Sequence, residues 1–111
     1  MRIVVSAAAI LFGLLHIIAA AAQFQSKDPA ARGGAALMAC GGVLLTSSAI
    51  AHLVYGGSAG WITALSAAVC GFLPICFAAY LNGKRSDSSH PSHHLVRGAI
   101  AVLLVIGMAV W

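Results

Sequence analysis

The residues of this sequence best able to do chemistry are a histidine and a run of hydroxyls inside long apolar segments. His16 interrupts the first segment, and Thr46, Ser47 and Ser48 follow one another in the second. Ionisable side chains within a membrane-spanning segment are uncommon, usually face the protein interior and often serve transport or proton relay. We therefore treat these four residues as a candidate intramembrane polar site. The alternative is structural, with a neutral imidazole bonded to a hydroxyl or carbonyl of a neighbouring helix.

A metal ion is a second chemical possibility for His16. Counting from span centres at about 1.5 Å per residue places Cys40 and Cys76 at a similar depth. One imidazole and two thiols are ligands that suit a soft metal ion. The alternative is that the cysteines are buried, inert side chains. Three cysteines without a CxxC spacing do not predict a disulfide framework.

Three further histidines share one polar segment with an aspartate: Asp87, His90, His93 and His94. Such a set could bind zinc, copper or nickel weakly, but a mobile loop must first lose conformational freedom. The alternative is a solvated loop. His52 is expected near the end of the second apolar segment, reaching lipid headgroups, and too far along the bundle to share a haem iron with His16. No cofactor is therefore expected.

The chain lacks the patterns of known enzyme sites. It contains no GxGxxG, GxxxxGK[ST] or HExxH sequence. One GxSxG match, residues 56–60, falls in the short glycine-rich connection between two apolar runs and not at the strand–turn–helix junction that this motif requires. Its two acids, Asp28 and Asp87, both lie outside the apolar segments, so paired carboxylates within the spans are excluded. We therefore expect a protein that is not an enzyme.

The composition indicates the surroundings of these residues. Of the 111 residues, 61% are hydrophobic and 7% are charged, with a mean hydropathy of +1.00. A soluble domain carries roughly 25% charged residues. The surface must therefore face a lipid bilayer. The net charge is +4, and four of the six basic residues lie in the connections between the apolar segments, which favours lipid headgroups over nucleic acid as the partner.

Four apolar runs are long enough to cross a bilayer. They are residues 3–22, 34–55, 61–81 and 95–111, with polar loops at 23–33 and 82–94. We predict a single all-α domain, a polytopic membrane protein built as an antiparallel bundle of four transmembrane helices. Asp28-Pro29 indicates a turn, or the cap and first position of a helix. Pro74 is expected to kink the third span and to free a carbonyl near Cys70.

Small residues recur at helical spacing in the first three spans and predict the contact faces. In the first span they are Ser6, Ala9, Gly13, His16, Ala20 and Gln23, in the second Ala35, Ala39, Gly42, Thr46 and Ala49, and in the third Thr63, Ala67, Cys70 and Pro74. Helices in lipid associate by close van der Waals contact, which requires small side chains. The first stripe is expected to face the second span. One stripe could instead join two chains.

The distribution of basic residues predicts the orientation. Lys27, Arg32, Lys84 and Arg85 flank one side of the expected bundle. Short basic loops stay in the cytoplasm, so we expect a multi-pass protein of the bacterial cytoplasmic (inner) membrane. Both termini lie outside and loops 23–33 and 82–94 lie inside. The aromatic residues agree, with Tyr55, Trp61 and Trp111 at the outer interface and Phe24 and Tyr80 at the inner one. Alternatively, residues 1–22 are a cleaved signal peptide.

The sequence favours a non-enzymatic accessory, assembly or scaffolding subunit of the membrane. Self-association or binding to a partner membrane protein would use the small-residue stripes. The alternative is a small oligomeric transporter or channel that uses His16 and the hydroxyls of Thr46, Ser47 and Ser48.

Overall fold

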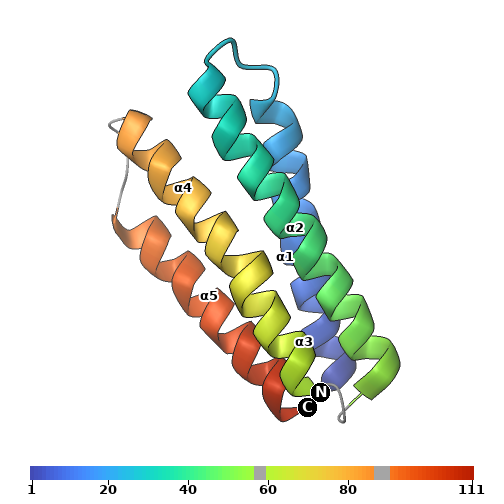
Figure 1. Cartoon of the computed structure of the whole chain (residues 1–111). Helices are drawn as coiled ribbons and strands as arrows, with labels where there is room; N and C mark the ends of the chain where they lie inside the picture. The colour runs from blue at the N-terminus through green and yellow to red at the C-terminus, as the bar shows by residue number, and fades with distance from the viewer. Residues whose placement is uncertain (57–59, 87–90) are drawn as a thin grey trace.

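The computed structural model describes residues 1–56, 60–86 and 91–111, and almost all of them are helical (Figure 1). The elements are α1 (Arg2–Gln23), α2 (Pro29–Tyr55), α3 (Gly60–Ser66), the π-helical segment η2 (Ala67–Phe72), α4 (Leu73–Ser86) and α5 (Pro91–Val110). The segments α3, η2 and α4 follow one another without a gap and form a third rod. Both termini lie at one end of the bundle, and the turn between α1 and α2 lies at the other (Figure 1).

Four helical stretches in the described residues are long and apolar enough to cross a membrane: Arg2–Gln23, Pro29–Tyr55, Gly60–Lys84 and Ser92–Val110. The distribution of side-chain size agrees with a lipid environment. Nine of the fourteen buried hydrophobic residues in the described part of the chain are alanines, whereas large side chains such as Ile3, Leu11 and Ile18 are at least 60% exposed. Small residues inside and large apolar residues outside are typical of helices that pack within a bilayer.

Local chemistry sets both ends of α2. Asp28 has an extended backbone, and its side chain accepts a hydrogen bond of 3.0 Å from the Ala30 N–H, while Pro29 fills the first helical position. A capping acid followed by proline favours the start of a helix. The first residue of a helix needs no backbone N–H, because that N–H would have no hydrogen-bond partner within the helix. The helix thus starts before the predicted apolar run at 34–55. It ends at Gly56, whose φ of 70° favours glycine.

The first span packs against α2 through the face that its small residues predict. Ser6, Ala9, Gly13, His16 and Ala20 are the buried residues of α1. A Cβ on Gly42 would lie 2.7 Å from the Gly13 carbonyl oxygen and 2.8 Å from Ile17 Cγ1, and a Cβ on Gly13 would collide with Thr46 Oγ1. The two backbones therefore meet at a point where only glycine fits.

The neighbouring glycine of α2, Gly41, makes a second close contact on a different face of the helix. A Cβ on Gly41 would lie 2.7 Å from the Gly71 carbonyl oxygen and 2.9 Å from Ile75 Cγ1. A Cβ on Gly71 would in turn lie 2.8 Å from Leu45 Cβ. Adjacent residues of a helix point about 100° apart. The Gly41-Gly42 pair thus lets α2 approach α1 with one residue and the third rod with the other.

The third rod differs from the prediction at Cys70. Pro74 cannot donate to the Cys70 carbonyl, and directly before it the chain widens into η2, where the Leu73 N–H bonds to the Ala68 carbonyl. This wider turn changes which residues face α2. Cys70 is exposed, while Gly71 and Phe72 are buried. The predicted stripe through Cys70 is therefore wrong at that position, and Gly71 takes its place.

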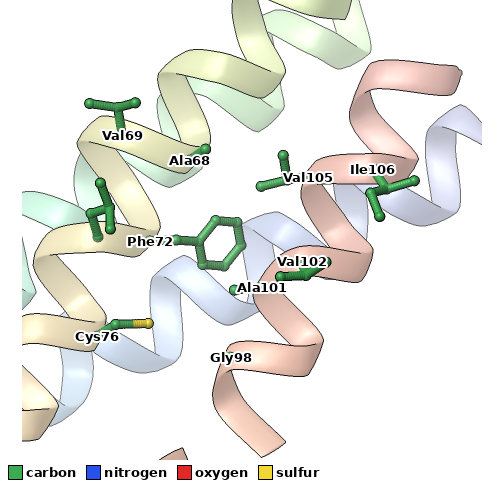
Figure 2. Close-up of a pocket in the computed structure, with 10 residues that line it drawn as sticks. Ala68, Val69, Phe72, Cys76, Gly98, Ala101, Val102, Val105 and Ile106 are labelled. Carbon is green, nitrogen blue, oxygen red and sulfur yellow. The ribbon is translucent and has the colours of Figure 1, made fainter. Parts of the chain in front are cut away.

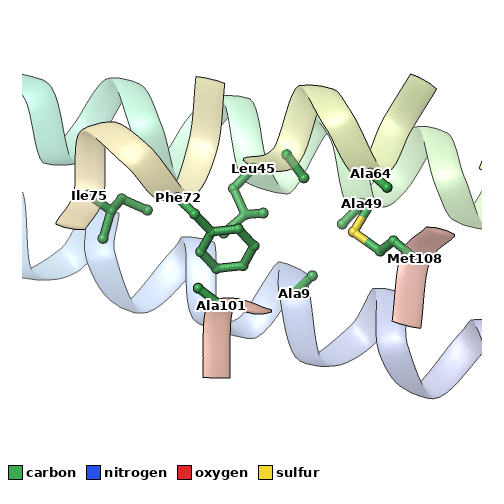
Figure 3. Packing of buried hydrophobic residues seen from close by; sticks show 9 residues of the cluster. Ala9, Leu45, Ala49, Ala64, Phe72, Ile75, Ala101 and Met108 are labelled. Carbon is green, nitrogen blue, oxygen red and sulfur yellow. The ribbon is translucent and has the colours of Figure 1, made fainter. Parts of the chain in front are cut away.

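The core receives side chains from every rod. Figure 3 shows Phe72 and Leu45 at the centre of the main cluster, with alanines of the other helices around them. The last helix contributes Ala101 and Met108. Only 17% of its candidate span is buried, against 33% in α1 and in α2 and 44% in the third rod. Consequently α5 is the helix least enclosed by the others.

Candidate functional site

His16 lies inside the bundle, at the point where α1 approaches α5. Its side chain is 8% exposed. The Nδ1 atom lies 2.7 Å from the Phe12 carbonyl oxygen, and since a carbonyl can only accept, Nδ1 carries the proton. The Phe12 and His16 rings also pack against each other, with centroids 4.4 Å apart and ring planes tilted by 31°. The imidazole is thus fixed by its own helix, which leaves Nε2 as the nitrogen available to a ligand.

A cleft of about 510 Å³ opens between α1 and α5 beside this histidine. Its lining is divided by polarity. The polar residues are His16, Ser92, His93 and Arg97, and the apolar residues are Phe12, Leu15, Val96 and Ile100. Arg97 lies within electrostatic range of the His16 ring and of the Cys76 thiol. The cleft therefore combines cationic or ionisable side chains with an apolar surface.

Two of the three hydroxyls predicted to join His16, those of Thr46 and Ser47, bond within their own helix. Thr46 Oγ1 donates to the Gly42 carbonyl oxygen at 2.8 Å, and Ser47 Oγ donates to that of Val43 at 2.9 Å. Thr46 and Ser48 are half-buried, but Ser47 faces outward. Consecutive residues point in different directions around a helix, so these three do not share a surface. The structure does not gather them with His16 into one polar site.

The residues considered for metal binding are likewise dispersed. Cys40 and Cys70 are exposed on the outer surface of the bundle rather than buried as expected, and Cys76 is half-buried. Within 1–56, 60–86 and 91–111, no three His, Cys, Asp or Glu side chains come together in a way that could hold a metal ion. His93 lines the cleft and His94 is half-buried, while His90 lies outside the described residues.

A second cavity of about 430 Å³ runs along the other side of α5 (Figure 2). Its residues come from η2, α4 and α5: Ala68, Val69, Phe72, Leu73, Cys76, Gly98, Ala101, Val102, Val105 and Ile106. We call this cavity the apolar groove, because none of these side chains carries a charge. Beside Gly98 the groove is open, since a Cβ there would meet no atom within 4 Å. The groove is thus open at the position where α5 carries a glycine.

Two aromatic rings separate the cleft from the apolar groove. Phe12 lines the cleft and Phe72 lines the groove, and their ring centroids lie 5.4 Å apart. Near the termini α5 is held more closely. A Cβ on Gly107 would lie 3.0 Å from the methyl groups of Val5, and a Cβ on Gly60 would lie 3.2 Å from the Met108 carbonyl oxygen. Cavities therefore flank α5 on both sides while its last turns are packed.

His52 does not reach the headgroup region, contrary to the sequence prediction. It is fully buried, and its Nδ1 lies 3.2 Å from Thr63 Oγ1, which itself donates to the Gly60 carbonyl oxygen at 3.0 Å. Gly60 lies beside the ring, since a Cβ there would be in ordinary van der Waals contact with His52 Cε1 at 3.8 Å. Two buried polar atoms in the described residues, His52 Nε2 and Ser6 Oγ, have no hydrogen-bond partner.

The cleft was not foreseen as a unit, although the sequence contained a signal for it. His16 stands seven residues before the end of α1, and Arg97 stands six residues after the start of α5. Because α1 and α5 run in opposite directions (Figure 1), this count places both at about 10 Å from the same end of the bundle. Counting residues along each span, as was done for the cysteines, would therefore have placed His16 and Arg97 at a similar depth.

Comparison of the chain with protein-family models, with curated proteins and with solved structures finds no match. The interpretation of the cleft and of the apolar groove therefore rests on their own geometry.

Proposed function

We propose that this protein is a non-enzymatic assembly subunit of a membrane, which associates with a second copy of itself through α5 and the apolar groove. The observation that carries the proposal is an apolar groove of about 430 Å³ beside the least buried helix of the bundle. The dimer would serve as a scaffold or accessory unit rather than as a catalyst.

The groove has the small residues that a helix–helix contact in lipid requires. Gly98 and Ala101 line it from α5, and Ala68 lines it from η2 (Figure 2). Small residues let two backbones approach, and van der Waals attraction at that short distance drives association where no hydrophobic effect operates. At Gly98 the space for a neighbouring helix is present, since nothing lies within 4 Å of a Cβ built there.

A second copy fits the groove for two reasons. Helix α5 forms one wall of the groove, and α5 also has exposed apolar side chains that a second copy would bury. Val102, Leu103 and Ile106 on α5 are 57%, 68% and 52% exposed. A twofold axis along the membrane normal would lay α5 of each copy across the groove of the other. Such a contact is self-complementary, as the interfaces of most homo-oligomers are.

We further propose the cytoplasmic membrane of a bacterium as the location, with both termini outside and the loop ends of the helices inside. This rests on the bias of short basic loops toward the cytoplasm. The aromatic residues support it. Tyr55, Trp61 and Trp111 are 71%, 76% and 48% exposed near the termini, and Phe24 and Tyr80 are 45% and 54% exposed toward the other end.

The dimer is tested by comparing Gly98→Leu with Gly33→Leu. Neither substitution meets an atom within 4 Å of its Cβ, so neither disturbs packing inside one chain. We expect the wild type and Gly33→Leu to be dimers in lipid vesicles. Gly98→Leu should weaken association about tenfold or more, because a large side chain then fills the approach between helices. Single-molecule photobleaching of the labelled protein in vesicles counts the copies. A monomeric wild type, or equal weakening by both substitutions, would contradict the proposal.

The runner-up function, a small oligomeric transporter or channel, would rely on His16 and on Thr46, Ser47 and Ser48. The hydrogen bonds of Thr46 and Ser47 to their own helix do not favour it. It is tested by reconstituted flux. If His16→Leu abolished a flux that the wild type supports, the transporter would replace the assembly subunit as the proposed function.

A further inference from the structure

The cleft between α1 and α5 carries positive charge, and no acid is among the described residues that line it. Arg97 lies six residues into α5, within its candidate membrane span, and is half-buried. The whole chain has two acids. Asp28 caps α2 by accepting from Ala30, and Asp87 lies outside the described residues. A guanidinium this far into a membrane span is costly to leave unpaired, and an anion is a partner that lowers this cost.

The other groups around Arg97 suit an anion that carries hydroxyls. Ser92 and His93 line the cleft toward the start of α5, with a hydroxyl and a second imidazole. Across the cleft, the His16 Nδ1 proton is used by Phe12, so Nε2 is left as an acceptor for a hydroxyl of the ligand. The geometry therefore provides donors for a charged oxygen and one acceptor beside them.

The rest of the cleft suits a hydrocarbon chain. Phe12 and Leu15 line it from α1, and Val96 and Ile100 line it from α5. Leu15 is 55% exposed and Val96 is 59% exposed, so both are open to the surrounding lipid. A ligand that places its charge on Arg97 can therefore continue along an apolar surface into the bilayer.

We propose that this cleft is a binding site for an anionic phospholipid of the surrounding membrane. The phosphate binds Arg97, with Ser92 and His93 as further contacts. A headgroup hydroxyl donates to His16 Nε2, and one acyl chain lies against Phe12, Leu15 and Ile100. The site lies on the opposite flank of α5 from the apolar groove, so it does not depend on the proposed dimer.

The test is native mass spectrometry of the full chain released from bilayers of equal parts phosphatidylglycerol and phosphatidylcholine. We expect the wild type to retain phosphatidylglycerol about fivefold more than phosphatidylcholine, as one basic residue near a membrane surface provides. Arg97→Gln should bring this ratio close to one, and Arg97→Lys should restore much of it. Circular dichroism and gel filtration verify that each variant is folded.

The matched control is Arg32→Gln, which removes the same charge from the same end of the bundle. Arg32 is exposed, and its Nε donates to the Ser26 carbonyl oxygen at 2.9 Å, away from the cleft. The control should keep the wild-type ratio. If both variants lowered the lipid ratio equally, the preference would come from surface charge alone, and the proposed binding site would be contradicted. An unchanged ratio in Arg97→Gln would overturn it too, since Arg97 would then have another partner.

A competition arm separates a lipid from free phosphate. Inorganic phosphate at millimolar concentration is added before release, and retained phosphatidylglycerol is counted. Retention should persist, because the acyl chain contributes to binding through Phe12, Leu15 and Ile100. Full displacement would show that the cleft recognises phosphate alone and would overturn the lipid assignment.

Discussion

The contact between α1 and α2 and the surroundings of α5 are built in opposite ways. In the first, Gly13 and Gly42 bring two backbones so close that neither position has room for a Cβ. In the second, Gly98 faces open space, and cavities of about 430 Å³ and about 510 Å³ flank the helix. Glycine thus allows a close helix contact at Gly13 and Gly42, whereas at Gly98 it lies beside space that no other part of the chain fills.

Glycine in a membrane helix can therefore serve two separate purposes. At Gly42 it contributes to the stability of the single chain, because a side chain there would displace α1. At Gly98 a Cβ would meet no atom of the same chain within 4 Å, so we expect the effect of a side chain there in an intermolecular measurement. Close backbone contacts therefore join α2 to α1 and to the third rod, and the proposed association would use the α5 side.

The largest effect is expected from Gly42→Leu. The new side chain would start 2.7 Å from the Gly13 carbonyl oxygen, so α1 must move away. We expect the free energy of unfolding to fall by about 3 kcal/mol, at the upper end of overpacking effects. Steric-trapping measurements in bicelles determine this free energy. Gly98→Leu is the matched control and should leave it unchanged.

Equal destabilisation by Gly42→Leu and Gly98→Leu would remove the contrast between the two helix surroundings. It would mean that α5 is as closely packed as the α1–α2 contact, and that the apolar groove is filled within one chain.

A smaller effect is expected from Thr63→Val, which acts on packing between α2 and α3. The substitution keeps the side-chain shape but removes the partner of His52 Nδ1 in a fully buried place. An additional unsatisfied polar atom should lower the free energy of unfolding by about 1–2 kcal/mol. The same bicelle measurement detects it. Ser6→Ala is the control, because Ser6 Oγ has no hydrogen-bond partner to lose. A loss from Ser6→Ala as large as that from Thr63→Val would contradict this explanation.

Prediction from the sequence succeeded best where small or weakly polar residues recur at regular spacing in an unbroken helix. The buried face of α1, from Ser6 to Ala20, follows directly from a 3–4 spacing that an unbroken helix preserves. The four apolar runs were visible for the same reason, since bilayer thickness sets their length. The cap at Asp28 was also visible, but the sequence alone left a turn open as an alternative.

Prediction failed where tertiary contacts or an irregular helix decide the outcome. Cys70 and Gly71 exchange places because η2 widens the turn before Pro74, and spacing rules assume 3.6 residues per turn. Gly41 faces the third rod and Gly42 faces α1. The prediction assigned one contact stripe to α2, so it could not include both contacts. His52 was placed at the interface from its position near a helix end, yet Gly60 and Thr63 enclose it. The candidate polar site of His16 and the α2 hydroxyls stays a prediction, and the hydroxyls of Thr46 and Ser47 bond to their own backbone.

The most direct test of association through α5 is disulfide cross-linking in native membranes, in a background where Cys40, Cys70 and Cys76 are replaced by alanine. Val102→Cys introduces a thiol at the apolar groove, and Leu11→Cys introduces one on the outer face of α1. The two positions are 57% and 60% exposed, and each lies about 17 Å from the loop end of its helix. We predict an oxidised dimer from Val102→Cys and none from Leu11→Cys. Equal yields from the two positions, or a dimer from Leu11→Cys alone, would contradict association through α5.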